Sequence, residues 1–241
     1  MKSYATTHIG RHRENNQDCV DLVKKDNMTF AILCDGMGGE SGGSIASSMC
    51  IKFLTNAFVN EFKKEYDVDN WLKHTIIRAN DDILKFASIN PKLLGMGTTL
   101  VCLLVMDDTC FYASVGDSRL YSYNKKEIKQ LSEDQTLVAT LLRGGYISEQ
   151  EAVNHPKRSL LLSAVGSSTS DQLDIQIRKV SLEENFLLCS DGLYNMLDKG
   201  EIFKILKEDE EISEKTQRLI SRANENGGYD NIGIILLEGL K

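Results

Sequence analysis

The sequence predicts an α+β protein built on antiparallel sheets. Strand-like segments follow one another through short turns, and helical segments follow one another in separate groups, which is typical of this class. Two buried strand-like runs also end on the same pair of residues, at Asp35-Gly36 and at Asp191-Gly192. Because a carboxylate at the end of a core strand is costly unless something pairs with it, these ends are candidates for a functional site.

The composition indicates one soluble domain over residues 1–241. Hydrophobic residues make up 41% of the chain and charged residues 26%, and with 2 prolines there is no Pro-rich linker. No run reaches the roughly 18 apolar residues of a membrane helix, and the N-terminus lacks the apolar core of a signal peptide. No basic patch accompanies the net charge of −7. We therefore expect a cytoplasmic protein that binds neither membrane nor nucleic acid.

The cysteines and histidines show no metal-binding pattern. The 6 cysteines lack C-x-x-C spacing and lie mostly in apolar runs, so we expect reduced core residues, not a zinc site or disulfides. His8 and His12 are the only close pair of histidines, and a zinc site there would lack its other ligands.

The N-terminal segment predicts a strand and then a hairpin. Residues 2–9 can form a strand, and a polar loop follows. The segments 19–23 and 28–34 read as two strands joined by a turn. Since the start of the first hairpin strand lies beside the end of the second, Asp18 and Asp35 should meet at one rim.

Two helices are expected next. An apolar stripe with a period of about 3.6 residues runs through residues 42–62. A second stripe covers about 70–87, where Asp67 or Asp69 can cap the start of the helix. Both stripes are expected to pack against the core.

The middle of the chain predicts a group of short strands and then a loop-rich excursion. A short helix through Leu142 opens the excursion, which extends to Ser170 and has the length of a functional lid. The expected strands cover residues 97–106, 109–115, 120–123 and 128–131.

The last third predicts three strands with two helices between them. The strands are expected over 173–180, 185–189 and 232–237. The helices are expected over about 199–208 and 213–226, after the second strand.

Five aspartates mark the ends of these predicted strands. Three of them follow strands and two precede strands, so in antiparallel sheets all of them can lie at one rim. Carboxylates crowded into a small volume must take up protons or cations. The alternative is five separate, solvated turn residues. The five are Asp18, Asp35, Asp117, Asp191 and Asp230.

The residue types in these turns indicate the chemistry of such a site. No histidine or cysteine lies in them, and all-oxygen ligands favour Mg²⁺ or Mn²⁺. Two such ions about 3.5–4 Å apart form the arrangement of phosphatases and nucleases, in which a bridging hydroxide attacks phosphorus in line. Arg13 lies just before Asp18 and can hold two phosphate oxygens, although it can also be an ordinary surface arginine.

Six short motifs, in order, carry a family resemblance. They are Arg13-x-x-Asn16-Gln17-Asp18, Asp35-Gly36-Met37-Gly38-Gly39, Gly97-Thr98-Thr99, Gly116-Asp117-Ser118-Arg119, Ser190-Asp191-Gly192 and Asp230-Asn231. Together they resemble the type-2C metal-dependent Ser/Thr protein phosphatases, the PPM family. The stretch from Arg143 to Gly166 is similar to the bacterial branch.

The resemblance implies an α-β-β-α sandwich, with two central antiparallel β-sheets flanked by helices and a binuclear Mn²⁺/Mg²⁺ centre at one end. It also implies a flap over about 143–165 that borders the substrate groove. By position, Asp35 would bridge the metals, the Gly36 carbonyl would bind one of them, and Asp191 and Asp230 would hold one metal. Asp18 would act on the other through water, Asp117 with Asp191 would bind a weaker third ion, and Arg13 would bind the phosphate.

Three positions depart from the family pattern. Gln17 stands where many members have Glu, which removes a negative charge near the second metal. Met37 stands where animal members have a His proposed as general acid, so the leaving oxygen must be protonated by water or another group. Gln135 stands where a His is common.

The function expected from the resemblance is hydrolysis of phosphoserine and phosphothreonine in phosphorylated proteins by a monomer that opposes a bacterial Ser/Thr kinase. One alternative is a phosphatase-like binding module without turnover, but such a module should have lost metal ligands. A two-metal nuclease or nucleotide hydrolase is another alternative, and the net charge of −7 counts against it.

Overall fold

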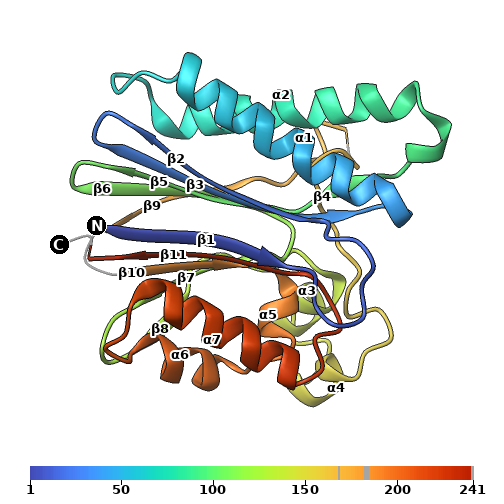
Figure 1. Ribbon diagram of the computed structural model, residues 1–241. Helices are drawn as coiled ribbons and strands as arrows, with labels where there is room; N and C mark the ends of the chain where they lie inside the picture. The colour runs from blue at the N-terminus through green and yellow to red at the C-terminus, as the bar shows by residue number, and fades with distance from the viewer. Residues whose placement is uncertain (168, 182–184, 240–241) are drawn as a thin grey trace.

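The computed structural model describes residues 1–167, 169–181 and 185–239. Two antiparallel sheets pack face to face, with α1 and α2 on one outer face and α6 and α7 on the other (Figure 1). The predicted α-β-β-α sandwich is therefore confirmed. None of the described helices combines the length and apolar composition needed to cross a membrane.

The first sheet contains the predicted hairpin. Its strand order is β2-β3-β5-β6-β9, and β4 pairs with the end of β3. The expected strand over 97–106 is broken at Thr99, and the one expected over 173–180 begins later. The strands are β2 (Asp18–Lys25), β3 (Met28–Met37), β4 (Gly97–Thr98), β5 (Leu100–Met106), β6 (Thr109–Val115) and β9 (Gln176–Ser181).

The second sheet joins the two ends of the chain. Its order is β1-β11-β10-β7-β8, so that the last strand lies between the first strand and β10. Every pairing in it is antiparallel. The strands are β1 (Lys2–His8), β7 (Arg119–Tyr123), β8 (Ile128–Gln130), β10 (Asn185–Cys189) and β11 (Ile232–Glu238).

The helices lie near their predicted positions. The first begins at Gly39, three residues before the expected start, because β3 leads directly into it. Of the two candidate caps, Asp67 accepts a hydrogen bond from the Asn70 amide. The helices are α1 (Gly39–Asn60), α2 (Val68–Ser88), η1 (Pro91–Leu93), α3 (Leu137–Arg143), α4 (Glu149–Val153), α5 (Asp191–Tyr194), α6 (Lys199–Leu206) and α7 (Ile212–Glu225).

The alternation of side chains along the strands produces three layers of apolar packing. In β3, Ala31 and Leu33 face the other sheet, whereas Phe30 and Ile32 pack against the cluster beneath α1 and α2. A third cluster fills the space between the second sheet and the helices α6 and α7. All six cysteines are free thiols, and every one except the half-buried Cys19 is buried, as predicted.

A buried ion pair connects α7 to the last strand. Lys215 donates to Glu238 at 2.8 Å, with side chains that are 8% and 16% exposed, and Tyr123 donates to the same oxygen at 2.7 Å. Glu238→Ala should lower the free energy of unfolding by about 3–5 kcal/mol, because it leaves a buried ammonium without its partner. Urea unfolding followed by circular dichroism measures the loss.

The matched control is Glu211→Ala. Its partner is Lys2, and both side chains are more than 60% exposed (62% and 64%). Losing an exposed pair should cost about 0–1 kcal/mol. Equal losses for the two variants would contradict a stabilising role for the buried pair.

Candidate metal centre

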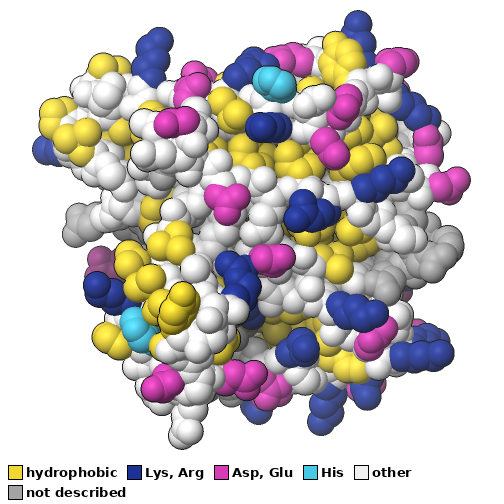
Figure 2. All heavy atoms as spheres, turned by 180° about the vertical axis from the view of Figure 1, so that it is seen from behind, with side chains coloured by type: hydrophobic (Ala, Val, Ile, Leu, Met, Phe, Trp, Pro, Cys, Tyr) yellow, Lys and Arg dark blue, Asp and Glu magenta, His cyan; other side chains and the backbone are white. Residues whose placement is uncertain are grey.

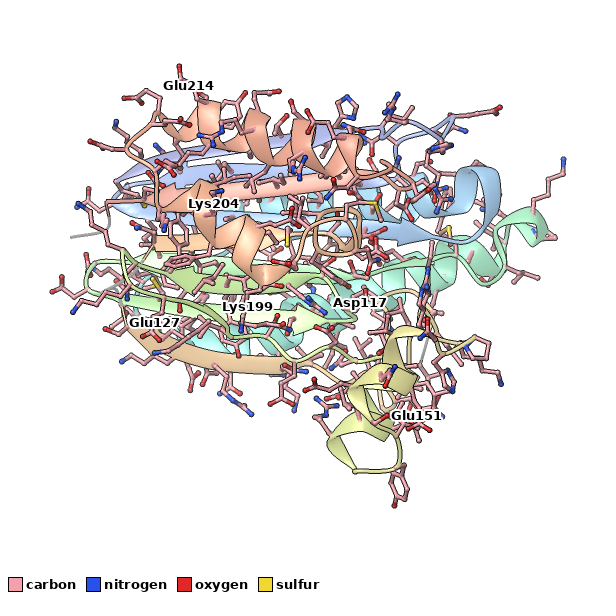
Figure 3. All side chains as sticks on the ribbon, turned by 90° about the horizontal axis from the view of Figure 1, so that it is seen from below. Asp117, Glu127, Glu151, Lys199, Lys204 and Glu214 are labelled. Atoms are coloured by element: carbon pink, nitrogen blue, oxygen red, sulfur yellow. The ribbon has the colours of Figure 1, made fainter. Side chains whose placement is uncertain are left out.

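All five aspartates lie at one end of the sandwich, as the strand pairing requires. Asp18 is directly opposite Asp35 in the β2–β3 ladder, which confirms the predicted meeting point. In the second sheet, Cys189 pairs with both Ile234 and Arg119. That register brings Asp191, which follows β10, close to Asp230 before β11 and to Asp117 before β7. Figure 3 shows Asp117 at these strand ends.

The aspartates surround a cavity of about 470 Å³. Four of the five line it, whereas Asp18 is buried behind them at 4% exposure. Arg13 and Met37 also line the cavity, and the described lining residues include neither histidine nor cysteine. The donor set therefore fits a hard cation such as Mg²⁺ or Mn²⁺.

Two glycines allow the backbone to close tightly behind the aspartates. A Cβ at Gly36 would lie 2.0 Å from the Gly43 carbonyl oxygen, so α1 can pack directly against the end of β3. A Cβ at Gly192 would lie 1.9 Å from the Asn231 carbonyl oxygen. The second contact holds the turn after Asp191 against the turn that carries Asp230.

Two threonines hold the backbone of Asp35. The Asp35 amide donates to Thr99 Oγ1 at 3.0 Å, and the Thr99 amide donates to the Asp35 carbonyl at 2.8 Å. Thr98 Oγ1 donates to the same carbonyl at 2.9 Å. These contacts explain why β4 and β5 are separate: Thr99 turns its hydroxyl to Asp35 and to Ser118, 2.7 Å away.

The crowded carboxylates favour bound protons when no cation is present. Loss of solvent on burial, with the charges of Asp18 and Asp191, raises the pKa of Asp35 well above its ordinary value. Burial and the charges of Asp117 and Asp230 raise the pKa of Asp191 to about 8. Burial also raises the pKa of Asp117 to about 6. A divalent cation can replace these protons.

Asp18 is buried and incompletely hydrogen-bonded. Its Oδ2 accepts a hydrogen bond from Ser190 Oγ at 2.6 Å, whereas Oδ1 is buried without a partner among the described residues. Burial raises the pKa of Asp18 to about 7 despite the hydrogen bond from Ser190. A buried oxygen without a partner, aimed at a cluster of acids, fits a site for a cation with its water.

The side chains as they stand are not arranged as a finished ligand set. Among residues 1–167, 169–181 and 185–239, no three His, Cys, Asp or Glu side chains are placed to hold one ion. Asp230 turns instead to Arg13, whose Nη2 donates to it at 2.7 Å, and Asp18 turns to Ser190. The metal-ligand assignments of Asp18 and Asp230 therefore stay predictions.

Asn231 and Ser190 lie in the quoted motifs, but the sequence assigned them no role. Asn231 accepts a hydrogen bond from the Gln17 amide at 2.8 Å and donates to the carbonyls of Ile9 and Asn15 at 2.8 and 3.0 Å. It therefore holds the loop that carries Arg13. The roles of Asn231 and Ser190 could not be read from the sequence around them, because both side chains bond to partners far away in the chain.

The sequence also did not predict a group of side chains that supports the turn at Asp117. Tyr194 donates to the Asp117 carbonyl at 3.0 Å, and the Arg119 guanidinium lies 3.5 Å from the centre of the Tyr194 ring. Asp134 pairs with Arg119 at 2.6 Å and keeps it in place. These contacts fix the turn on which Asp117 lies.

The three departures from the family pattern have different environments. Gln17 donates to the Gly39 carbonyl at 2.8 Å, and Met37 lines the cavity, where its thioether carries no proton to give. Gln135 accepts from the Gly116 amide at 2.6 Å and donates to the Asp174 carbonyl at 3.0 Å. Gln135 therefore ties the turn before Asp117 to the segment that returns from the excursion.

The raised carboxyl pKa values predict how pH affects the metal-free protein. In the folded protein the pKa of Asp18 is about 7, that of Asp117 about 6 and that of Asp191 about 8, all above the ordinary 3.8. Between the ordinary and the folded pKa, the folded state therefore binds more protons than the unfolded chain. In EDTA, the free energy of unfolding should therefore fall as pH rises from about 4 to about 8. Urea unfolding at several pH values measures it.

Added Mn²⁺ or Mg²⁺ should remove most of this fall, because the cation takes the place of the protons. Asp18→Asn should show a shallower fall in EDTA than the unchanged protein. A free energy of unfolding that stays constant or rises over this pH range in EDTA would contradict the crowding of charges.

Comparison with known proteins identifies the family. Residues 6–230 match the family model described as Protein phosphatase 2C. The serine/threonine phosphatase stp of Listeria monocytogenes is 38% identical over 241 residues, covering 99% of this chain and 96% of that protein. Protein phosphatase PhpP of Streptococcus pneumoniae is 36% identical over 239 residues, covering 98% and 97%.

Solved structures agree with the sequence relatives. Serine/threonine phosphatase Stp1 from Staphylococcus aureus has a TM-score of 0.92 at 32% identity, covering 99% of this chain and 95% of that one. The catalytic domain of protein phosphatase PstP, in complex with two manganese ions, has a TM-score of 0.83 at 30% identity, covering 98% and 96%. The predicted fold and phosphatase class are thereby confirmed, and the two manganese ions of PstP agree with the Mn²⁺ or Mg²⁺ expected for this chain. The chain belongs to the protein phosphatase 2C family of serine/threonine phosphatases.

Proposed function

We propose that phosphate is released at the cavity lined by the aspartates. The observation that carries this proposal is the position of Asp35, at the end of a core strand and influenced by the charges of the four other aspartates. Asp35 is proposed to bridge two Mn²⁺ or Mg²⁺ ions, with the Gly36 carbonyl, Asp191 and Asp230 as further ligands. Asp18 is proposed to act through water, and Asp117, with Asp191, on a weaker third ion.

The bound ions supply a Lewis acid and an activated water at neutral pH. The chain supplies the placement: Thr98 and Thr99 hold the Asp35 backbone, and Ser190 orients the carboxylate of Asp18. Placement of this kind contributes to catalysis because the reacting groups need not reorganise during the reaction.

Arg13 is proposed to bind the substrate phosphate. Its guanidinium lines the cavity and remains 51% exposed, while one nitrogen pairs with Asp230. A guanidinium fork matches two phosphate oxygens, and its charge is present at every working pH. The Asn231 hydrogen bonds to the Arg13 loop support this role, since they fix where the guanidinium can reach.

The leaving oxygen of the substrate is proposed to take its proton from water. Met37 lies where a proton donor would stand, and the cavity is lined by no described histidine. Residues 143–165 are proposed to form the flap of a single 1–241 phosphatase domain. Ser159 and Leu161 of this segment line the cavity, and a backbone bridge joins Val165 to Thr98. In Figure 3, Glu151 lies out on this flap.

The family implies phosphoprotein substrates. We further propose that the protein is a cytoplasmic monomer that opposes a bacterial serine/threonine kinase. The complete set of aspartates counts against a binding module without turnover, and the net charge of −7 counts against a nuclease.

Asp35→Asn tests the proposed site. Loss of the bridging charge should lower the hydrolysis of p-nitrophenyl phosphate and of a phosphothreonine peptide by several orders of magnitude in Mn²⁺, with the fold intact by circular dichroism. EDTA should abolish the activity of the unchanged protein.

The matched control is Asp21→Asn on the same hairpin. Asp21 bonds to Thr55 and lies outside the cavity, so its substitution should leave most of the activity. More than a tenth of the activity remaining in Asp35→Asn, or no metal-dependent phosphate release by the unchanged protein, would sink the proposal.

A further inference from the structure

A second cleft, of about 590 Å³, continues from the cavity of the metal centre. Asp117, Ser159, Asp191 and Asp230 line both spaces, so the two lie side by side. An extended chain advances about 3.3–3.6 Å per residue. A segment whose phosphorylated side chain enters the first cavity therefore places a neighbouring residue over the second cleft.

Many of the side chains that line this cleft are apolar. They come from α3, from α4, from the segment after α5 and from the turn before β11, which are well separated in the sequence. Several of these side chains remain exposed, with Leu142 at 37%, Val153 at 69% and Tyr229 at 61%. Figure 2 shows hydrophobic side chains gathered at the end of the molecule where the flap lies. Such gatherings mark binding surfaces more often than single exposed residues do. The apolar lining comprises Val138, Ala139, Leu142, Ala152, Val153, Met196 and Tyr229.

Tyr229 lines the second cleft beside Asp230, which lines both spaces. Three consecutive residues of the N-terminal loop contact three consecutive residues before β11. The Arg11 amide donates to the Gly228 carbonyl at 2.8 Å, the His12 and Tyr229 rings stack with centroids 5.0 Å apart, and Arg13 pairs with Asp230 at 2.7 Å. One face of the Tyr229 ring is thus supported, and the rest remains open. A ring fixed in advance loses little freedom on binding.

Two arginines also line the cleft. Arg119 is committed to Asp134 and to the Tyr194 ring. Arg158 also lines the cleft, so an acidic neighbour of the phosphorylated residue is the competing occupant. The described lining also includes four aspartates, which disfavour an acidic occupant. The exposed apolar side chains therefore favour an apolar occupant.

We propose that this cleft binds an apolar side chain of the phosphoprotein substrate, next to the phosphorylated residue, and that Tyr229 is a specificity-determining residue. The proposal rests on the function proposed for the first cavity. It names the substrate class as phosphoserine or phosphothreonine segments with a leucine, methionine or phenylalanine within a few residues of the phosphate.

The test uses phosphothreonine peptides that differ only in the residues beside the phosphothreonine, which are leucine, serine or glutamate. The unchanged protein should prefer the leucine peptide over the serine peptide by about 10-fold in kcat/KM, and the difference should lie in KM because the contact forms on binding. Tyr229→Ser and Val153→Ser should each reduce this preference, and Tyr229→Phe should retain it.

Tyr146→Ser is the matched control. Tyr146 is 79% exposed on the flap and lines neither space, so its substitution should keep the preference for the leucine peptide. An equal loss in Tyr146→Ser would assign the effect to the flap as a whole and overturn the role of Tyr229.

The two proposals fail in different ways. Equal kcat/KM for the leucine and serine peptides, or a preference for glutamate, would overturn the apolar cleft while metal-dependent hydrolysis of p-nitrophenyl phosphate still supports the catalytic site. Absence of that hydrolysis by the unchanged protein would overturn both.

Discussion

The main constraint on this structure is the repulsion among five carboxylates that lie together at one end of a β-sandwich. Antiparallel pairing places the start of one strand beside the end of the next, so residues far apart in sequence arrive at a common rim. Their charge cannot stay uncompensated in partly desolvated surroundings. Hydroxyl, guanidinium and backbone donors compensate part of it, and the proposed divalent cations would compensate the rest.

The rigid parts of the fold place the carboxylates, and the loops place the groups that meet the substrate. Close backbone contacts at Gly36 and Gly192 leave the strand ends little room to move. Arg13 and Tyr229 instead lie on two loops that are joined to each other residue by residue. With this division, the proposed metal centre would stay fixed while the neighbouring loops determine which substrates bind.

Much of the fold and the composition of the site could be predicted from the sequence. The pairing of Asp18 with Asp35 follows from the hairpin, because a short turn determines which residues lie opposite each other. The break at Thr99 could not be predicted, since threonine is itself common in strands and the cause is its bond to Asp35. The partners of Asp230 and Asp18 were also inaccessible. They depend on side chains that only the tertiary fold brings near.

The position of β11 between β1 and β10 affects when the fold can be completed during synthesis. The final strand is an interior strand of its sheet, and the turn before it carries Asp230 and Tyr229. Until residues 230–238 have been synthesised, the sheet therefore lacks an interior strand and the acidic cluster lacks Asp230. One short segment therefore completes both the sheet and the acidic cluster.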